Sequence, residues 1–313
     1  MGVILMFAYL IRRILTTIPV IIGVILVVFI LTTIVPGDPA RIMMGQRGDP
    51  ETIKLIREEM GLDNPIPVQL YDFYKDVFTF NLGRSYRNNQ TVVQAIVGRL
   101  PVTATLAIGS MIVAVLLGVS LGIFSATHQY TFLDYISMFI SLIGMSAPVY
   151  FIGLLLVLLF ATHLGWIPGT GLGNGEWIYY LLPIVTLGVR PMALIVRLTR
   201  STMLEVIHED YVTTARSKGL KEKAVIFKHA LKNALIPVVT IIGLQTATLL
   251  SGVILTETIY SLPGLGRLSI QAVINRDFPI IRGVVLFMAL VFVVANLLVD
   301  LSYGFFDPRI RYD

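Results

Sequence analysis

The sequence predicts an all-α membrane protein with six transmembrane helices. Of its 313 residues, 56% are hydrophobic and only 14% are charged, and the mean hydropathy is +0.82. Soluble domains carry roughly 25% charged residues. A bilayer core requires about 20 mostly apolar residues per helix. The segments that meet this length are 11–34, 102–126, 135–161, 177–198, 235–258 and 279–303.

The first apolar segment is predicted to be a retained helix. Arg12 and Arg13 lie at its start, and no small-residue cleavage site follows it. A removable signal peptide has a shorter apolar region of roughly 7–15 residues. We therefore expect residues 1–34 to form an N-terminal transmembrane helix.

The following segment, 35–98, is predicted to be a helical external loop. Ile53, Ile56 and Met60 lie at helical spacing, and Gly61 follows as a suitable helix C-terminus. A turn rich in proline then leads to a second short helix near 69–78. We expect a small folded cap on the outer face, and a simple spacer is the alternative.

Two features inside the spans predict how the helices pack. Gly118 and Gly122 have the small-xxx-small spacing of a helix-packing surface. Pro148 lies inside the third span, where it removes a backbone donor, so a kink is expected there.

Arg190 is a charged residue near the middle of the fourth span. A charge at this depth is unfavourable in lipid and should face a partner or a wet cavity, which makes Arg190 a candidate for contact with substrate. A long side chain can also extend to an interface, and carbonyls freed by the neighbouring Pro191 could satisfy the guanidinium. Asp300, near the inner end of the sixth span, is interpreted as an interface or structural acid. The candidate residues of a substrate path are Arg190, Ser146, Gln245 and Glu257.

The basic residues predict the orientation of the chain. Segment 197–232 holds eight Lys and Arg against four acids, whereas hairpin 162–176 holds no Lys or Arg. Short cytoplasmic loops carry the excess of positive charge. We therefore expect both termini and the loop after the fourth span to be cytoplasmic. Counted from 33 to 100, the external loop and its flanks have eight basic and eight acidic residues and do not decide the orientation.

Several functions are excluded by what the sequence lacks. Without cysteine there can be no disulfide, zinc-thiolate site or thiol nucleophile. The glycine-rich "GTGLGNG" at 169–175 follows no predicted strand and lacks the Gly-Lys-Ser/Thr ending of a phosphate loop. The net charge of +5 comes from residues that flank apolar spans, so we expect no nucleic-acid partner. If the protein uses ATP, another polypeptide must bind it. The histidines, none of which pair at metal-site spacing, are His128, His163, His208 and His229.

The cytoplasmic stretch "EDYVTTARSKGLKEKAVIFKHALKNALIP" predicts two helices. Glu209 and Asp210 suit a helix N-terminus, and Arg216 and Lys218 suit its last turn. Gly219 can adopt the left-handed conformation that ends the helix, with Leu220 folding back as a hydrophobic contact. The second helix then continues into the fifth span.

One face of the first helix is predicted to dock on another protein. Tyr211, Thr214, Ala215 and Lys218 lie at i, i+3, i+4 and i+7, and this narrow face of small and mixed side chains suits a groove on a partner better than lipid.

These residues carry a family resemblance. "DYVTTARSKGL" and "FKHALKNALIPV" resemble the cytoplasmic loop of binding-protein-dependent ABC importer permeases, in the oligopeptide, dipeptide and nickel branch, B-type permease. The loop departs from the general Glu-Ala-Ala-x3-Gly-x9-Ile-x-Leu-Pro consensus, because Thr213, Thr214 and Ala215 replace Glu-Ala-Ala, although Gly219 is kept. Such departures are typical of the peptide branch. The resemblance covers nearly the whole chain, and its other pieces are "VPGDPAR", "LDNPIPVQLYDF", "RLPVTATLA", "RLTRSTMLEV", "ETIYSLPGLGRL" and "VDLSYGFFDPRIR".

The resemblance implies a type I ABC importer permease fold, with a permease core at 99–304, a coupling loop at 200–234 and a cytoplasmic tail at 305–313. It also implies a homologous sister permease, two ABC ATPase subunits that bind ATP and Mg, and an external solute-binding protein. The location would be the cytoplasmic membrane of a bacterium or archaeon. The residues implied in coupling to the ATPase are Glu209, Asp210, Tyr211, Thr214, Ala215, Arg216, Lys218, Gly219 and Leu220.

The expected cargo is a dipeptide or oligopeptide, and a nickel or oligosaccharide importer of the same family is the alternative. A secondary transporter would be expected to show inverted repeats and buried ionisable relays, and the sequence offers no clear repeat. A membrane enzyme would require convergent acid/base or metal-ligating residues, which the sequence lacks.

Overall fold

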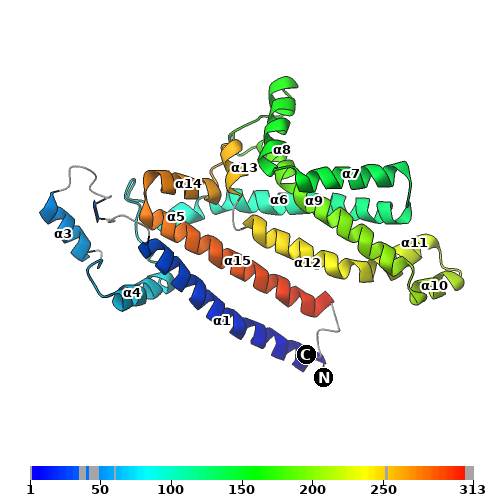
Figure 1. Ribbon diagram of the computed structural model, residues 1–313, viewed down its shortest axis with the longest axis horizontal. Helices are drawn as coiled ribbons and strands as arrows, with labels where there is room; N and C mark the ends of the chain where they lie inside the picture. The colour runs from blue at the N-terminus through cyan, green and yellow to red at the C-terminus, as the bar shows by residue number, and fades with distance from the viewer. Residues whose placement is uncertain (1, 35–39, 42–48, 60, 251–252, 307–313) are drawn as a thin grey trace.

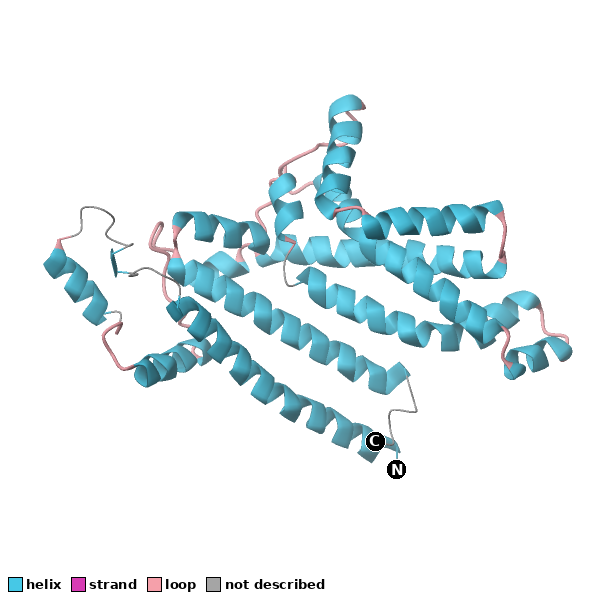
Figure 2. Cartoon of the chain, in the orientation of Figure 1, coloured by secondary structure: helices cyan, strands magenta, loops and turns pink. Residues whose placement is uncertain are grey.

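The computed structural model describes residues 2–34, 40–41, 49–59, 61–250 and 253–306. Within these ranges the regular secondary structure is helical, and strand pairing is limited to one isolated bridge between Arg84 and Thr91 (Figure 2). The prediction of an all-α protein is confirmed.

Five helical segments of the described chain are long and apolar enough to cross a membrane, and a sixth is bent. In Figure 1 the long helices run side by side along the molecule. Large apolar side chains such as Ile30 and Leu116 are exposed on them, as lipid-facing positions would be. The long helices are α1 (Gly2–Ile34), α6 (Leu100–Thr127), α9 (Ile178–Ile207), α12 (Leu231–Leu250) and α15 (Phe278–Phe306).

The third predicted span is broken into two parts. Helix α7 (Phe132–Ser146) meets α8 (Val149–Leu156) and the π-helix η2 (Val157–His163) at an angle of 109°. Ala147 is extended, with φ −74° and ψ 134°, and Pro148 begins α8. Proline lacks a backbone N–H and disfavours a helical residue before it, so the predicted kink becomes a break.

The segment predicted to be an external loop contains the two predicted helices, α3 (Pro50–Glu59) and α4 (Ile66–Phe78). Gly61 adopts φ +64° just after α3, as expected, whereas Met60 lies outside the described residues. Helix α4 packs on α1, where the rings of Phe73 and Phe29 lie 5.9 Å apart. A short helix, α5 (Val92–Val97), leads into α6.

The fifth span ends earlier than the sequence indicated. Helix α12 ends at Leu250, and the predicted end of the span, up to residue 258, lies partly in a separate helix, α13 (Ile254–Ile259). A turn then leads to α14 (Leu265–Asn275). Figure 1 shows α13 and α14 at an angle to α12. The apolar run of the predicted fifth span therefore continues beyond the end of α12, because the later part of the run belongs to a chain segment that turns back to pack on α6.

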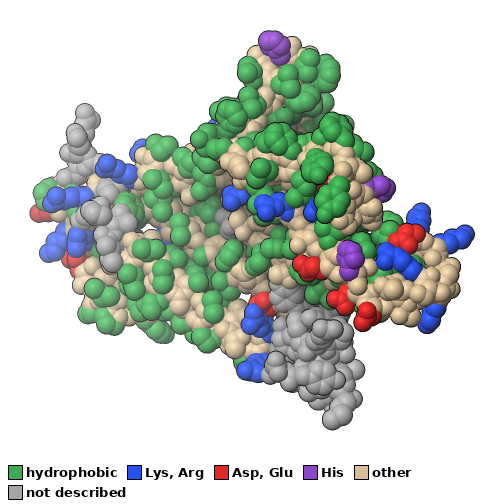
Figure 3. All heavy atoms as spheres, turned by 45° about the vertical axis from the view of Figure 1, so that its right-hand side comes forward, with side chains coloured by type: hydrophobic (Ala, Val, Ile, Leu, Met, Phe, Trp, Pro, Cys, Tyr) green, Lys and Arg blue, Asp and Glu red, His purple; other side chains and the backbone are tan. Residues whose placement is uncertain are grey.

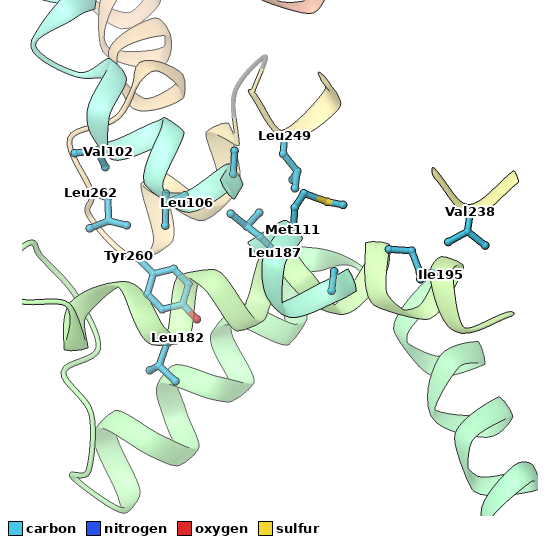
Figure 4. Close-up of a cluster of buried hydrophobic side chains, with 12 residues drawn as sticks. Val102, Leu106, Met111, Leu182, Leu187, Ile195, Val238, Leu249, Tyr260 and Leu262 are labelled. Carbon is cyan, nitrogen blue, oxygen red and sulfur yellow. The ribbon is translucent and has the colours of Figure 1, made fainter. Parts of the chain in front are cut away.

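Helices α6 and α9 form the centre of the fold. A Cβ at Gly118 would lie 2.8 Å from Ile195 Cγ2, and one at Gly122 would lie 2.5 Å from Thr199 Cβ, so the prediction of a glycine packing surface is confirmed. Figure 4 shows the adjoining cluster of apolar side chains, in which the Tyr260 hydroxyl hydrogen-bonds Thr186 Oγ1 at 2.7 Å.

The two terminal helices lie side by side and antiparallel. Arg13 Nε on α1 donates to Asp300 Oδ2 on α15 at 2.9 Å, and Ile25 packs near Leu286. Asp300 is therefore a structural acid, as predicted. Figure 1 places the described ends of α1 and α15 on the side of the molecule where α12 begins. Most of the predicted tail, at 307–313, lies outside the described residues.

Candidate functional site

The predicted cytoplasmic helix is present as α10 (Asp210–Ser217). Glu209 precedes it in an extended conformation, and Asp210 lies in its first turn. Gly219 adopts φ +75° at the other end, the left-handed region that favours glycine. Both predicted ends of the helix are confirmed.

The inner face of α10 is buried inside the chain. Val212 is 0% exposed and Ala215 is 5% exposed. They pack with Met203 of α9 and with Val225 of the segment that leads into α12. Ala215 was expected on the docking face, and the structure places it on the opposite, inward face. Its small side chain permits α10 to approach the core closely.

Hydrogen bonds attach α10 to two membrane helices. Arg216 Nη1 donates to the carbonyl oxygen of Ile207 at the end of α9, at 3.2 Å. Arg216 Nη2 also donates to Glu222 Oε1 at 2.9 Å, and this pairing raises the pKa of Arg216. Asn233 Nδ2 at the start of α12 donates to the Tyr211 hydroxyl at 2.7 Å. A displacement of α10 would therefore pull on both α9 and α12.

The outer face of α10 remains free within this chain. Tyr211 is 41% exposed, and Thr214 and Lys218 are exposed beside it. Leu220 was expected to fold back on the helix, but it is 43% exposed. An apolar side chain at this position extends the candidate docking surface, which we define as Tyr211, Thr214, Lys218 and Leu220 and call the docking surface below. Arg216, Glu209 and Asp210 border it.

The candidate path residues do not form one cluster. Arg190 is exposed near the middle of α9, and Ser146 is exposed at the break between α7 and α8. The end of α7 packs on the middle of α9, since a Cβ at Gly144 would lie 3.0 Å from Val189 Cγ1. Arg190 and Ser146 thus belong to neighbouring elements. Gln245 is half-buried on α12.

Glu257 is fully buried, with 0% of its surface exposed. Its carboxylate accepts a hydrogen bond from Thr103 Oγ1 of α6 at 2.6 Å and from the Arg267 backbone N–H at 2.9 Å. Thr103 Oγ1 in turn accepts from the Leu265 N–H at 2.9 Å. Glu257 therefore holds the start of α14 against α6, and no part of its side chain faces an open path within this chain.

An ion pair that was not predicted from the sequence joins α7 and α9. Arg200 Nε and Nη2 donate to the two oxygens of Asp134, each at 2.9 Å, and Ser125 of α6 hydrogen-bonds the same carboxylate. Asp134 is 2% exposed. This two-pronged contact fixes three helices near α10. Arg200 was not among the candidate residues, and nothing in the sequence indicated that Asp134 would be its partner.

Known protein families provide a context for the fold and for α10. A sequence profile described as the inner membrane component of binding-protein-dependent transport systems matches residues 118–312. A second profile, for the N-terminal part of such membrane components, matches residues 6–107. The chain belongs to this family.

Several relatives of this permease family are similar over almost their whole length. A dipeptide transport system permease protein of Alkalihalophilus pseudofirmus is 43% identical over 98% of this chain and 100% of the relative. A glutathione transport system permease protein of Pectobacterium atrosepticum is 41% identical, again over 98% and 100%. A probable peptide ABC transporter permease protein of Sinorhizobium fredii is 42% identical over 97% of this chain and 99% of the relative.

A solved structure shares the fold. One chain of the MetNI methionine ABC transporter, in an inward-facing conformation, matches with a TM-score of 0.51 and 17% identity. The match covers 66% of this chain and 95% of that chain. The type I importer permease architecture predicted for this multi-pass inner-membrane protein is therefore the one it adopts.

Proposed function

We propose that this permease imports dipeptides or other short peptides in an ATP-driven ABC transporter. Relatives described as dipeptide, glutathione and peptide permeases support this cargo. The chain would form the translocation path with a homologous sister permease and receive solute from an external binding protein. Two separate ATPase subunits would bind and hydrolyse ATP with Mg, so this chain would not itself be an enzyme.

The observation that carries the proposal is the attachment of α10. Its inner face is buried, two membrane helices hold it by hydrogen bonds, and its outer face is exposed. An amphipathic helix that is rigid toward its own chain and open on the other side suits docking into a groove on a partner. We place this surface and both termini in the cytoplasm because basic residues concentrate in the loop that contains α10.

The mechanism follows from that attachment. When ATP binding brings the two ATPases together, the ATPase that is docked on α10 would carry this helix with it. Arg216 would transmit the displacement to the end of α9, and Tyr211 would transmit it to the start of α12. Rigid-body movement of packed helices is a common way to switch between two states. Here it would convert a path open to the cytoplasm into one open to the outside.

Uptake into proteoliposomes tests the proposal. The chain is reconstituted with its sister permease, ATPases and binding protein, and uptake of labelled dipeptides and tripeptides is measured with ATP and with a non-hydrolysable analogue. We expect uptake only with ATP. Competition by Ni²⁺ or an oligosaccharide, with no effect of peptides, would assign the alternative cargo. Uptake that depends on a proton gradient instead of ATP would indicate a secondary transporter and overturn the proposal.

A further inference from the structure

One exposed face of α9 is unusually polar for a membrane helix. Its exposed positions recur at i, i+7, i+11, i+15 and i+18, a spacing that keeps them on one side of the helix. We call this face the α9 stripe, and its residues are Arg190, Arg197, Ser201 and Glu205 of α9 and His208, which directly follows the helix.

The depth of Arg190 makes the stripe significant. At 1.5 Å per residue, Arg190 lies about 18 Å from Ile178 and about 12 Å from Leu198, the predicted inner end of the fourth span, along the helix axis. Both distances exceed what an arginine side chain can span to reach an interface. A guanidinium at this depth requires water or a polar partner.

The chain itself does not supply that partner among its described residues. Arg190 makes no hydrogen bond or ion pair there, and the side-chain contact of Arg197 is with Met145 Sδ at 3.3 Å. Arg200, on an adjacent face of the same helix, shows the contrast, because it is paired with the buried Asp134. The fold thus neutralises one arginine of α9 and leaves two others on the exposed stripe.

The surroundings of the stripe are suited to a hydrated path. Ser146 is exposed at the end of α7, where the helix breaks beside the middle of α9. Figure 3 shows a small group of basic side chains in the middle of one face, set among hydrophobic side chains and apart from the charged loop at the edge of the molecule.

We propose that the α9 stripe lines the hydrated translocation path and attracts the carboxylate of the solute through Arg190 and Arg197. This inference rests on the proposed function and names the chemical feature of the cargo that the path recognises. Two guanidinium groups one above the other present a positive field along the path, and arginine is well suited to carboxylates because its donors match the two oxygens. Glu205 lies further toward the α10 end, where its negative charge would favour release of the carboxylate.

Because the chain contains no cysteine, single thiols test the stripe directly. Ser201→Cys places a thiol one helical turn from Arg197 while both arginines remain. In the assembled transporter we expect it to react with water-soluble thiosulfonate reagents, and faster with a sulfonate than with a trimethylammonium reagent. Each rate is divided by the rate at which the same reagent modifies a small free thiol in solution. The ratio of the sulfonate rate to the trimethylammonium rate should then be on the order of fivefold. Adding Arg197→Gln should abolish most of the preference.

Two controls sharpen this experiment. Leu116→Cys replaces a side chain that is 63% exposed on the apolar surface of α6, and it should react little because lipid covers it. Lys221→Gln removes a charge from the cytoplasmic loop, away from the stripe, and should leave the sulfonate preference of Ser201→Cys unchanged.

The outcomes separate the stripe from the transport function. If Ser201→Cys is unreactive in the assembled transporter, the sister permease buries the stripe. If the two reagents react at equal rates, the arginines do not attract anions to the stripe. Either result overturns the inference. Neither measurement requires peptide transport, which the uptake assay tests separately. A dipeptide should also slow modification more than its C-terminal amide, and equal protection would refute carboxylate recognition.

Discussion

Substituting Gly219 by valine tests the importance of the left-handed end of α10. Gly219 has φ +75°, and a Cβ there would meet nothing within 4 Å. The substitution therefore causes backbone strain without a steric collision. A left-handed conformation costs an L-residue roughly 1–2 kcal/mol. Relief of that strain would unwind the last turn of α10 and displace Lys218 and Leu220 of the docking surface.

The strain predicts a measurable loss of coupling. A change of 1–2 kcal/mol alters an equilibrium by a factor of about 5–30. If only the correctly formed helix transmits ATPase movement, uptake and solute-stimulated ATP hydrolysis should fall by about this factor, while membrane insertion remains normal. Asparagine tolerates the left-handed region, so Gly219→Asn should retain most of the activity.

Gly165 provides a matched control. It has φ +63° and nothing within 4 Å of a Cβ position, but it lies after η2 and outside the α10 loop. Gly165→Val should therefore introduce similar strain with little effect on coupling. Normal uptake with Gly219→Val, or an equal loss with Gly165→Val, would refute the argument that the end of α10 has a special role.

Three other changes test the packing of α6 on α9, the hydrogen bonds of Glu257 and the role of the external loop. Gly122→Val should lower thermal stability in detergent by roughly 1–3 kcal/mol through overpacking against Thr199, whereas Gly23→Val, which meets nothing within 4 Å, should have little effect. Glu257→Ala should lower stability by roughly 1–3 kcal/mol because the buried Thr103 hydroxyl loses its acceptor; an unchanged melting temperature would contradict this. Replacing 53–78 by a flexible linker should weaken solute delivery and leave basal ATP hydrolysis intact, and unchanged uptake would make the external loop a spacer.

The features that sequence predicted best depend on nearby residues. The ends of α10 follow from the acids at 209 and 210 and from Gly219, all within one short segment. The glycine packing surface of α6 could also be predicted from the sequence, because Gly118 and Gly122 lie about one turn apart on the same helix. Local backbone preference and helical periodicity are properties of the sequence itself.

The features that were missed depend on tertiary contacts. Glu257 was named among the candidate residues of a substrate path. In the structure the chain turns back after α13, and the carboxylate satisfies donors at the start of α14. Ala215 was assigned to the docking face because spacing alone does not reveal which face of an amphipathic helix meets its own chain. The partner of Arg200 is 66 residues away along the chain, beyond any local pattern.

Helix α9 connects the two candidate sites into one mechanical unit. Its end at Ile207 is held by Arg216 of α10, and its middle carries Arg190. The ion pair between Arg200 and Asp134 and the close contact at Gly122 fix the intervening turns to α7 and α6. A packed interior transmits displacement because it has little free volume to absorb it. Movement of α10 should therefore shift the arginines of the stripe relative to the path, so that ATPase movement, transmitted through α9, would change the attraction of a carboxylate.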